Sequence, residues 1–341
     1  MDLINQGLTF SYFLFLHFFR MMYWVWIPGF LFSAFFSLRY QESARSRLLS
    51  RGGLFAAVLY GITSSPSRKK ALGIAGELKQ KGVGTAKVLA YLIASQNLVI
   101  YFLVILMAMM GAEFALGQLM GGIIMILLVA SGWRLFMGKE ILQPSPVGSE
   151  GVVGLQPTWS GLLLSGSGWW KALKYIGGEF RYFWFNLAIG ILLGGMILAA
   201  GLQKWWIDFS QIGGGGILSD ILSAFVAPIL GMILFVPPVG NLAVISNLFK
   251  TYTIGYPGVV SFVLVSMLNP LILSGYARLL GRRRAMVLVG LLFLSAFVSG
   301  LLVTALYALF GFRPGHVPLG RELVDEIIRW LPFTMGKMSG M

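Results

Sequence analysis

Residues 217–238 read ILSDILSAFVAPILGMILFVPP, an apolar helix that closes at two prolines. A mildly polar helix candidate, residues 239–253, follows directly. The same order occurs earlier in the chain, where the apolar stretch 52–63 ends at Ser64-Ser65-Pro66 and a polar-faced helix, residues 71–81, comes next. Proline removes a backbone donor and breaks a helix. We therefore interpret each apolar–proline–polar element as a re-entrant hairpin, which leaves the membrane on the side where it entered.

The amino-acid composition indicates a membrane protein. Hydrophobic residues make up 57% of the 341 residues and charged residues 11%, whereas a soluble domain carries about 25% charged residues. Several apolar stretches are long enough to cross a hydrocarbon core of about 30 Å, and the sequence lacks the alternating segments of a membrane barrel. The sequence therefore predicts an all-α polytopic membrane protein and excludes the soluble globular and disordered classes.

The two hairpins belong to a pattern of elements that occurs twice, in residues 21–138 and again in residues 182–311. Each repeat is predicted to hold about three spans and one proline-broken hairpin, which gives about eight apolar membrane segments in all. An odd number of crossings per repeat inverts the second repeat relative to the first, a recurrent design of secondary transporters. The expected spans are 21–38, 85–110, 117–136, 183–202, 259–277 and 286–310; the other segments are an interfacial N-terminal helix (1–20), a Gly/Pro/Ser-rich linker that ends in an interfacial helix (139–181) and an amphipathic C-terminal tail (312–341).

The charges are distributed as in a protein of the cell inner (plasma) membrane. Lys and Arg number 26 against 12 Asp and Glu, which gives a formal charge of +14. A soluble protein this basic would raise the question of nucleic acid, but here the basic residues lie between apolar segments, as they do in cytoplasmic loops. With re-entrant hairpins, the loops near Arg45, 68–81, 139–181 and 282–284 all fall on one face, in agreement with the positive-inside rule. We expect contact with the lipid bilayer and no nucleic-acid partner.

Reactive and metal-ligating residues are few. The chain has no cysteine, and its two histidines, His17 and His316, lie near opposite ends. The missing cysteines exclude disulfides, thiolate metal sites and cysteine nucleophiles. The acidic pair Asp325-Glu326 lies on the polar face of the tail helix, so it does not form a catalytic constellation with either histidine. We expect no metal, no cofactor and no enzymatic activity.

Broken helices expose backbone N–H and C=O groups that can bind a solute near the middle of the membrane. We therefore predict a substrate path at the two hairpin tips, at a polar run inside span 85–110 and at the Asn-Pro step of span 259–277. The alternatives are a helix stop or cap at each tip, interhelical hydrogen bonds along the polar run and an ordinary kink at Asn-Pro. Asp220 and Lys87 are the isolated charges nearest the membrane interior, and they either serve in coupling or reach water at the span ends. The predicted path residues are Ser64, Ser65, Pro66, Ser95, Gln96, Asn97, Pro237, Pro238, Gly240, Asn241, Asn269 and Pro270.

A series of landmarks in the second half resembles a known family. They are Gly240-Asn241-Leu242-Ala243-Val244-Ile245, Leu248, Gly255, Val259-Val260-Ser261-Phe262, Pro270 and the basic run to Arg284. In the first half, Trp26-Ile27-Pro28-Gly29-Phe30 and the glycine-led helix from Gly82 through Ala90-Tyr91-Leu92 fit more loosely. Together they resemble the predicted-permease family that includes the organoarsenical efflux permeases. The resemblance covers most of residues 21–310 and implies an inner-membrane permease, with efflux of trivalent organoarsenicals as the best-known activity.

Two departures from the family bear on the substrate. Family members often carry a Cys-x-Cys motif after the first-hairpin proline, where this chain reads Ser67-Arg68-Lys69-Lys70. The residue after the second-half proline is often acidic in the family, and here it is Leu271. Soft metalloids prefer thiolate ligands, so a different or more polar substrate stands beside organoarsenicals as an alternative.

These observations predict a secondary permease that exports a small solute or ion by alternating access between the two hairpins. A non-transporting subunit or assembly factor of a membrane complex is the alternative from another class. A membrane-embedded enzyme fits the sequence less well, because paired carboxylates with a histidine or a metal cluster are missing.

Overall fold

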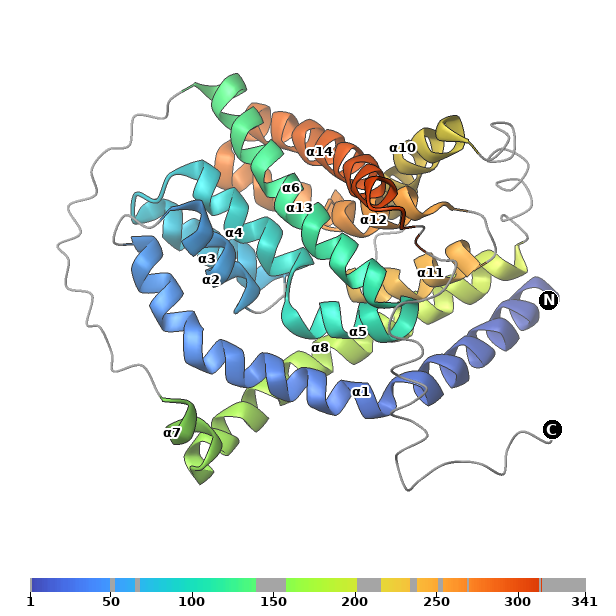
Figure 1. Ribbon diagram of the computed structural model, residues 1–341, viewed down its shortest axis with the longest axis horizontal. Helices are drawn as coiled ribbons and strands as arrows, with labels where there is room; N and C mark the ends of the chain where they lie inside the picture. The colour runs from blue at the N-terminus through green and yellow to red at the C-terminus, as the bar shows by residue number, and fades with distance from the viewer. Residues whose placement is uncertain are drawn as a thin grey trace.

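The computed structural model describes residues 2–49, 53–64, 68–138, 158–200, 216–233, 238–250, 254–268, 270–312 and 314. Within these residues all regular elements are helices, as expected from the sequence (Figure 1). They are α1 (Asp2–Leu49), α2 (Leu54–Ile62), α3 (Arg68–Gln80), α4 (Thr85–Asn97), α5 (Ile100–Met110), α6 (Ala112–Met137), α7 (Trp159–Leu163), α8 (Gly166–Ala199), α10 (Ile217–Ile233), α11 (Pro238–Lys250), α12 (Tyr256–Val265), α13 (Pro270–Leu280) and α14 (Arg282–Leu309).

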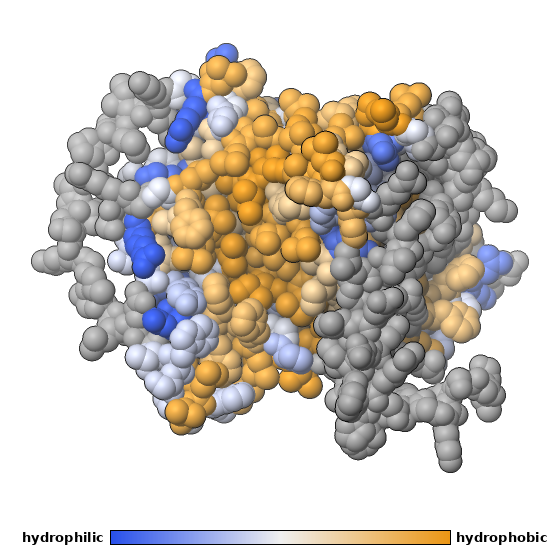
Figure 2. All heavy atoms as spheres, in the orientation of Figure 1, coloured by the Kyte–Doolittle hydropathy of each residue, from blue (hydrophilic) through white to orange (hydrophobic). Residues whose placement is uncertain are grey.

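Several of the helices are long and apolar enough to cross a membrane. Among the described residues α6, most of α8, and α14 meet that requirement singly, and the bent pair α4–α5 meets it as one unit. Helices α10 and α12 are apolar but shorter. Hydrophobic residues cover the middle of the face seen in Figure 2, and hydrophilic residues gather at its left edge. The fold is that of a multi-pass helical membrane protein.

Two predicted boundaries are absent because the flanking helices are continuous. The interfacial helix expected to end near Arg20 and the span expected after it form the single helix α1, with Pro28 inside. The interfacial helix expected at 169–181 likewise continues into the following span as α8. Aromatic side chains hold α1 and α8 together: the Trp26 ring lies 5.4 Å from the Trp184 ring, measured between centroids. This packing stabilises α1 and α8 as continuous helices, although the local sequence of each favours a break.

Both glycine-led spans are broken in the middle, contrary to the expectation of single spans. The first separates into α4 and α5 with a bend of 43°, directly after the polar run that ends at Asn97. The second separates into α12 and α13, and Pro270 is the first residue of α13, a position that proline favours because its missing N–H is not needed there. Each break therefore coincides with the polar or proline residues that the sequence analysis singled out.

The order of helices from α2 to α6 recurs from α10 to α14. In the first series α2 packs against α4, and in the second α10 packs against α12. A glycine with positive φ joins the last two helices of each series, Gly111 (119°) before α6 and Gly281 (88°) before α14. The two series meet where α6 packs against α14. These correspondences agree with two repeats, and their inversion across a membrane stays a prediction.

Candidate functional site

The first hairpin tip follows the end of α2. Ser64 is fully buried, and its hydroxyl donates a hydrogen bond to the carbonyl oxygen of Tyr60, 2.6 Å away. The Tyr60 ring stacks on Tyr91 of α4, with 5.0 Å between the ring centroids. The hydroxyl of Ser64 is thus hydrogen-bonded to the last turn of α2. Ser65 and Pro66 lie outside the described residues.

A close approach of two backbones fixes α2 against α4. A Cβ atom added to Gly61 would lie 2.7 Å from the carbonyl oxygen of Tyr91 and 2.9 Å from the amide nitrogen of Ser95. Only glycine allows backbones to come this near. The first tip is therefore held tightly beside the polar run of α4.

The second hairpin tip contains a buried side-chain amide, that of Asn241. Helix α10 ends at Ile233 and α11 begins at Pro238, while Pro237 lies outside the described residues. Asn241 is fully buried, and among the described residues neither its amide nitrogen nor its amide oxygen has a hydrogen-bond partner. An unmade hydrogen bond at a buried amide costs about 1–3 kcal/mol. The tip therefore keeps a donor and an acceptor that a bound solute or water could satisfy.

The polar run in α4 has one side chain that bridges the two series. The Asn97 amide nitrogen donates to the carbonyl oxygen of Leu264 in α12, 3.1 Å away. The Gln118 side chain of α6 donates to the carbonyl oxygen of Asn97 at 3.5 Å. This interhelical bonding is the alternative role that the sequence left open for Asn97.

The other two members of the run differ from Asn97. The Ser95 hydroxyl donates within its own helix to the carbonyl oxygen of Leu92, 3.0 Å away. Gln96 is 4% exposed, and neither of its side-chain polar atoms has a partner among the described residues. Gln96 thus resembles Asn241 in holding unused hydrogen-bonding capacity.

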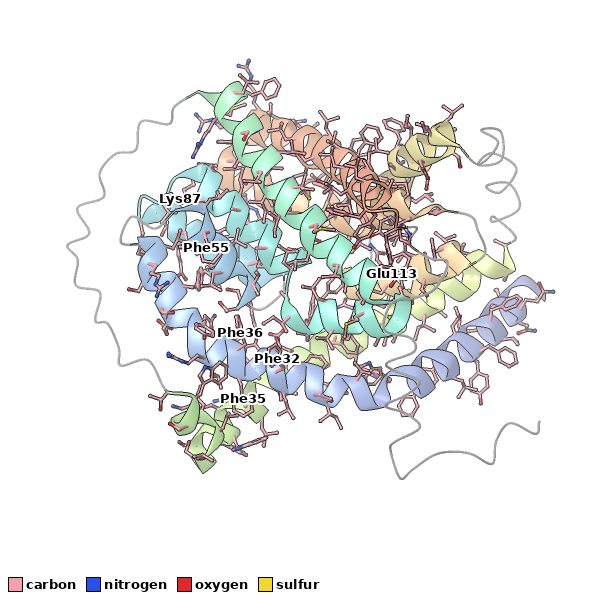
Figure 3. The ribbon with its side chains drawn as sticks, in the orientation of Figure 1. Phe32, Phe35, Phe36, Phe55, Lys87 and Glu113 are labelled. Carbon is pink, nitrogen blue, oxygen red and sulfur yellow. The ribbon has the colours of Figure 1, made fainter. Side chains whose placement is uncertain are left out.

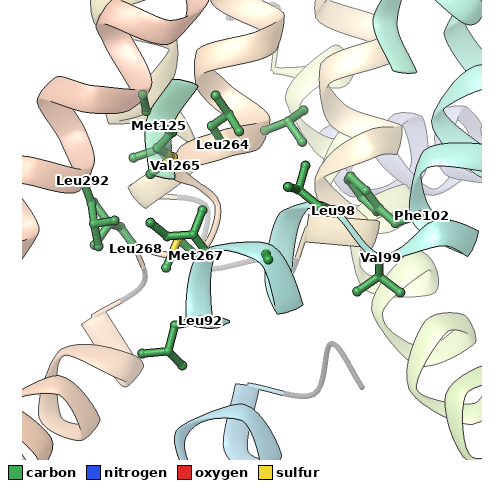
Figure 4. Packing of buried hydrophobic residues seen from close by; sticks show 14 of the residues in the cluster. Leu92, Leu98, Val99, Phe102, Met125, Leu264, Val265, Met267, Leu268 and Leu292 are labelled. Carbon is green, nitrogen blue, oxygen red and sulfur yellow. The ribbon is translucent and has the colours of Figure 1, made fainter. Parts of the chain in front are cut away.

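The two helix breaks lie near each other. Figure 4 shows Met267, from the α12–α13 break, beside the end of α4, with Leu98 on the other side of that helix end. The contacts of Asn97 agree with this, since its amide also lies 3.6 Å from the sulfur of Met267. Asn269 lies outside the described residues, and of Pro270 only its place at the start of α13 is described.

Helix α8 runs beside both hairpins. On one side, a cavity of about 860 Å³ is lined by Lys70 of α3 and by α8 residues that include Glu179 and Tyr182. Further along the same helix, Gly190 lies very near Gly240 of α11. A Cβ atom added to Gly190 would overlap the carbonyl oxygen of Gly240. Glu179 and Gly190 are separated by about 16 Å along the helix, at 1.5 Å per residue. One stretch of α8 therefore connects the neighbourhoods of the two tips.

The predicted interior charges and the buried acids are different residues. Asp220 and Lys87, the expected interior charges, are only partly buried. Among the described residues, the buried acidic side chains are those of Glu113 (1% exposed) and Glu179 (4% exposed). Figure 3 shows Lys87 near the start of α4, away from Glu113 at the start of α6.

Glu113 and Glu179 were not among the predicted site residues. The backbone carbonyl of Glu113 accepts hydrogen bonds from Tyr256 (3.0 Å) and Tyr307 (2.8 Å), which belong to the second series. For Glu179, a signal was present in the spacing, because Tyr175, Glu179 and Tyr182 share one face of a helix. The described residues contain no group of three or more acidic or histidine side chains that could hold a metal ion.

Comparisons with known proteins agree on one family. A family model described as "Predicted permease" matches residues 11–305. A similar protein is "Putative permease Rv2963" of Mycobacterium tuberculosis (strain ATCC 25618 / H37Rv), which is 28% identical over 277 residues, covering 77% of this chain and 68% of the relative. No solved structure matches the chain. The family match extends over most of the chain, from α1 to α14, and the chain belongs to the predicted-permease family.

Proposed function

We propose that this membrane permease is a secondary transporter that exports a small solute by alternating access, with the substrate path along α8 between the two hairpin tips. The support is the position of α8, which borders the cavity beside Lys70 at one hairpin and contacts Gly240 at the other. The buried amides of Asn241 and Gln96, which have no hydrogen-bond partner among the described residues, supply hydrogen-bonding capacity of the kind a polar solute needs. A scaffold subunit would gain nothing from such groups, because each one costs stability.

The proposed mechanism uses the repeat. Residues 21–138 and 182–311 would form two inverted repeats in the inner (plasma) membrane, and each hairpin would open toward one face. The junction of the two breaks, where Asn97 bonds to the Leu264 carbonyl oxygen, is the place where the repeats would move against each other.

The substrate class is narrowed by the residues present. The chain has no cysteine, so a trivalent arsenical would lack the thiolates that bind it best. Amides and aromatic rings suit a small solute that has polar atoms and an apolar body. Organoarsenicals remain one class to test, beside more polar solutes.

The substrate experiment compares cells that express the full chain with cells that carry an empty vector. The strain is sensitised by deletion of its own exporters, and the panel holds methylated arsenicals, metalloids and small anions. Resistance to at least one compound, followed by its uptake into everted vesicles without ATP, would support the proposal. A protein that assembles normally and moves none of the compounds would favour the subunit alternative.

The inverted arrangement can be tested in the same chain, because it is naturally free of cysteine. Single cysteines replace Gly53, beside which a Cβ atom has open space, and Ile217, which is 80% exposed. Gly53 directly precedes α2, and Ile217 is the first residue of α10, the corresponding hairpin helix. We expect an impermeant maleimide to label Gly53→Cys from the cytosolic face and Ile217→Cys from the opposite face. Labelling of both from one face would refute the inversion.

A further inference from the structure

Glu179 is a buried acid in a helix whose neighbouring side chains are exposed. It is 4% exposed, whereas Phe180, the next residue in α8, is 41% exposed. Its side chain lies at the cavity of about 860 Å³ between α8 and Lys70. A carboxyl group placed this deeply costs free energy unless it is hydrogen-bonded or paired, and ionisable residues inside a membrane protein usually have a function.

Hydroxyl groups from three helices gather near Glu179. Tyr101 of α5 interacts with Glu179 and also lies near Tyr175 and Tyr182 of α8. Tyr175 in turn accepts a hydrogen bond from Ser37 of α1, at 3.3 Å. Hydroxyl groups can donate to a carboxylate and accept from a protonated carboxyl group. The cluster can therefore accommodate Glu179 in both forms.

Two cations line the same cavity. Arg181 lies on α8 itself, and Lys70 belongs to the first turn of α3, in the first hairpin. Burial favours the neutral form of a carboxyl group, whereas a nearby cation favours the charged form. Because Lys70 lies on the hairpin and Glu179 on α8, any movement of the hairpin changes the distance between them.

We propose that Glu179 is the proton-binding site of this permease, and that the Lys70 ammonium group and a proton alternate at its carboxylate as the first hairpin moves. In the step, a hydronium ion in the cavity gives its proton to a carboxylate oxygen of Glu179 and leaves as water; the reverse step returns the proton. The inference rests on the proposed transport function and adds the coupling ion and its residue.

The first experiment needs no substrate. Purified full-length protein in lipid carries one fluorescent label at Gly73→Cys, on α3, where a Cβ atom has open space. The pH is stepped while label fluorescence and the infrared band of protonated carboxyl groups are recorded. We expect both signals to change with one midpoint. Glu179→Gln should remove both changes, while Glu113→Gln, at the other buried acid, should leave them in place.

Two further variants separate titration from a structural role. Glu179→Asp keeps a titrating group and should restore the pH response. Lys70→Met removes the competing cation and should move the midpoint to higher pH, because the proton then binds without competition. This variant keeps the test decisive even where Glu179→Gln fails to fold. An unchanged midpoint in Lys70→Met, or a full response in Glu179→Gln, would overturn the proposal.

Transport assays distinguish this inference from the proposed function. A compound that wild type and Glu179→Gln move equally well, with the same pH dependence, would refute proton coupling at Glu179 and leave the permease intact. A pH response at Glu179 without transport of any compound in the panel would instead count against the transporter while supporting the proton site.

Discussion

The two hairpin tips differ in how their polar groups are satisfied. At the first tip, the Ser64 hydroxyl donates a hydrogen bond to the Tyr60 carbonyl oxygen in the last turn of α2, and Gly61 fixes α2 against α4 through backbone contact. At the second tip, Asn241 is equally buried but has no partner among the described residues. The polar group of the first tip is therefore used within the fold, whereas the second tip keeps an amide that the proposed substrate path would use. Corresponding places in the two series of helices therefore differ in their polar contacts.

The largest expected effect is on transport at the second tip. Asn241→Leu removes a donor and an acceptor of the proposed path, so we expect the transport rate to fall by about tenfold or more, equivalent to about 1.4 kcal/mol. The thermal stability should stay the same or rise, because the buried unsatisfied amide disappears. Uptake into vesicles and the melting temperature in detergent measure the two properties on the same preparation.

Controls for this experiment come from both tips. Ser246→Ala trims another buried side chain of α11 and should leave transport close to wild type. Ser64→Ala should reduce transport less than Asn241→Leu does, since that hydroxyl is already bonded. Equal losses at Ser64 and Asn241 would remove the distinction between the tips.

The next effect is on stability and concerns two glycines at corresponding helix contacts. Gly61→Ala puts a methyl group 2.6 Å from the Ala94 Cβ atom and 2.7 Å from the Tyr91 carbonyl oxygen, and such overpacking costs about 1–3 kcal/mol. Gly231→Ala meets its nearest atom, the Phe262 carbonyl oxygen, only at 3.1 Å. The better helix propensity of alanine, up to about 1 kcal/mol, can offset that contact. We expect a clear decrease of the melting temperature for Gly61→Ala and a smaller change for Gly231→Ala. A larger decrease for Gly231→Ala would contradict the tighter packing of α2 against α4.

The smallest expected effect is on thermal stability, and it distinguishes Asn97 from its neighbour Gln96 in α4. Asn97→Leu leaves the Leu264 carbonyl oxygen without its donor, at a cost of about 0.5–1.5 kcal/mol. Gln96→Leu removes an amide that has no partner among the described residues, so the stability should be unchanged or higher. Thermal unfolding of both variants beside wild type tests this, and equal destabilisation would indicate that Gln96 has a bonded partner after all.

Much of the fold follows from sequence patterns. The apolar and polar helices of both hairpins, and the spans at α6 and α14, lie close to their predicted positions, because apolar length and proline position decide them locally. The breaks inside the two glycine-led spans were marked by the polar run ending at Asn97 and by Pro270. They were expected as possible kinks or binding positions rather than as helix ends.

Features that depend on contacts between distant segments were not predictable in the same way. The continuity of α1 and α8 depends on their packing against each other, which neither stretch reveals alone. Glu179 lies among aromatic and basic residues that suggest a helix on the membrane surface, and its burial arises from α1 and α5. Asp220 and Lys87 stood out because they interrupt apolar stretches, yet both remain partly exposed.

The contact of Gly190 with Gly240 has a mechanical consequence. Two helices that touch through bare backbone have no interlocking side chains at that point, so one can slide or rotate over the other without changes of rotamer. This backbone contact between α8 and α11 is directly next to Asn241, whose amide has no hydrogen-bond partner in the described part of the chain. A side chain at either glycine would push the two helices apart and hinder this movement.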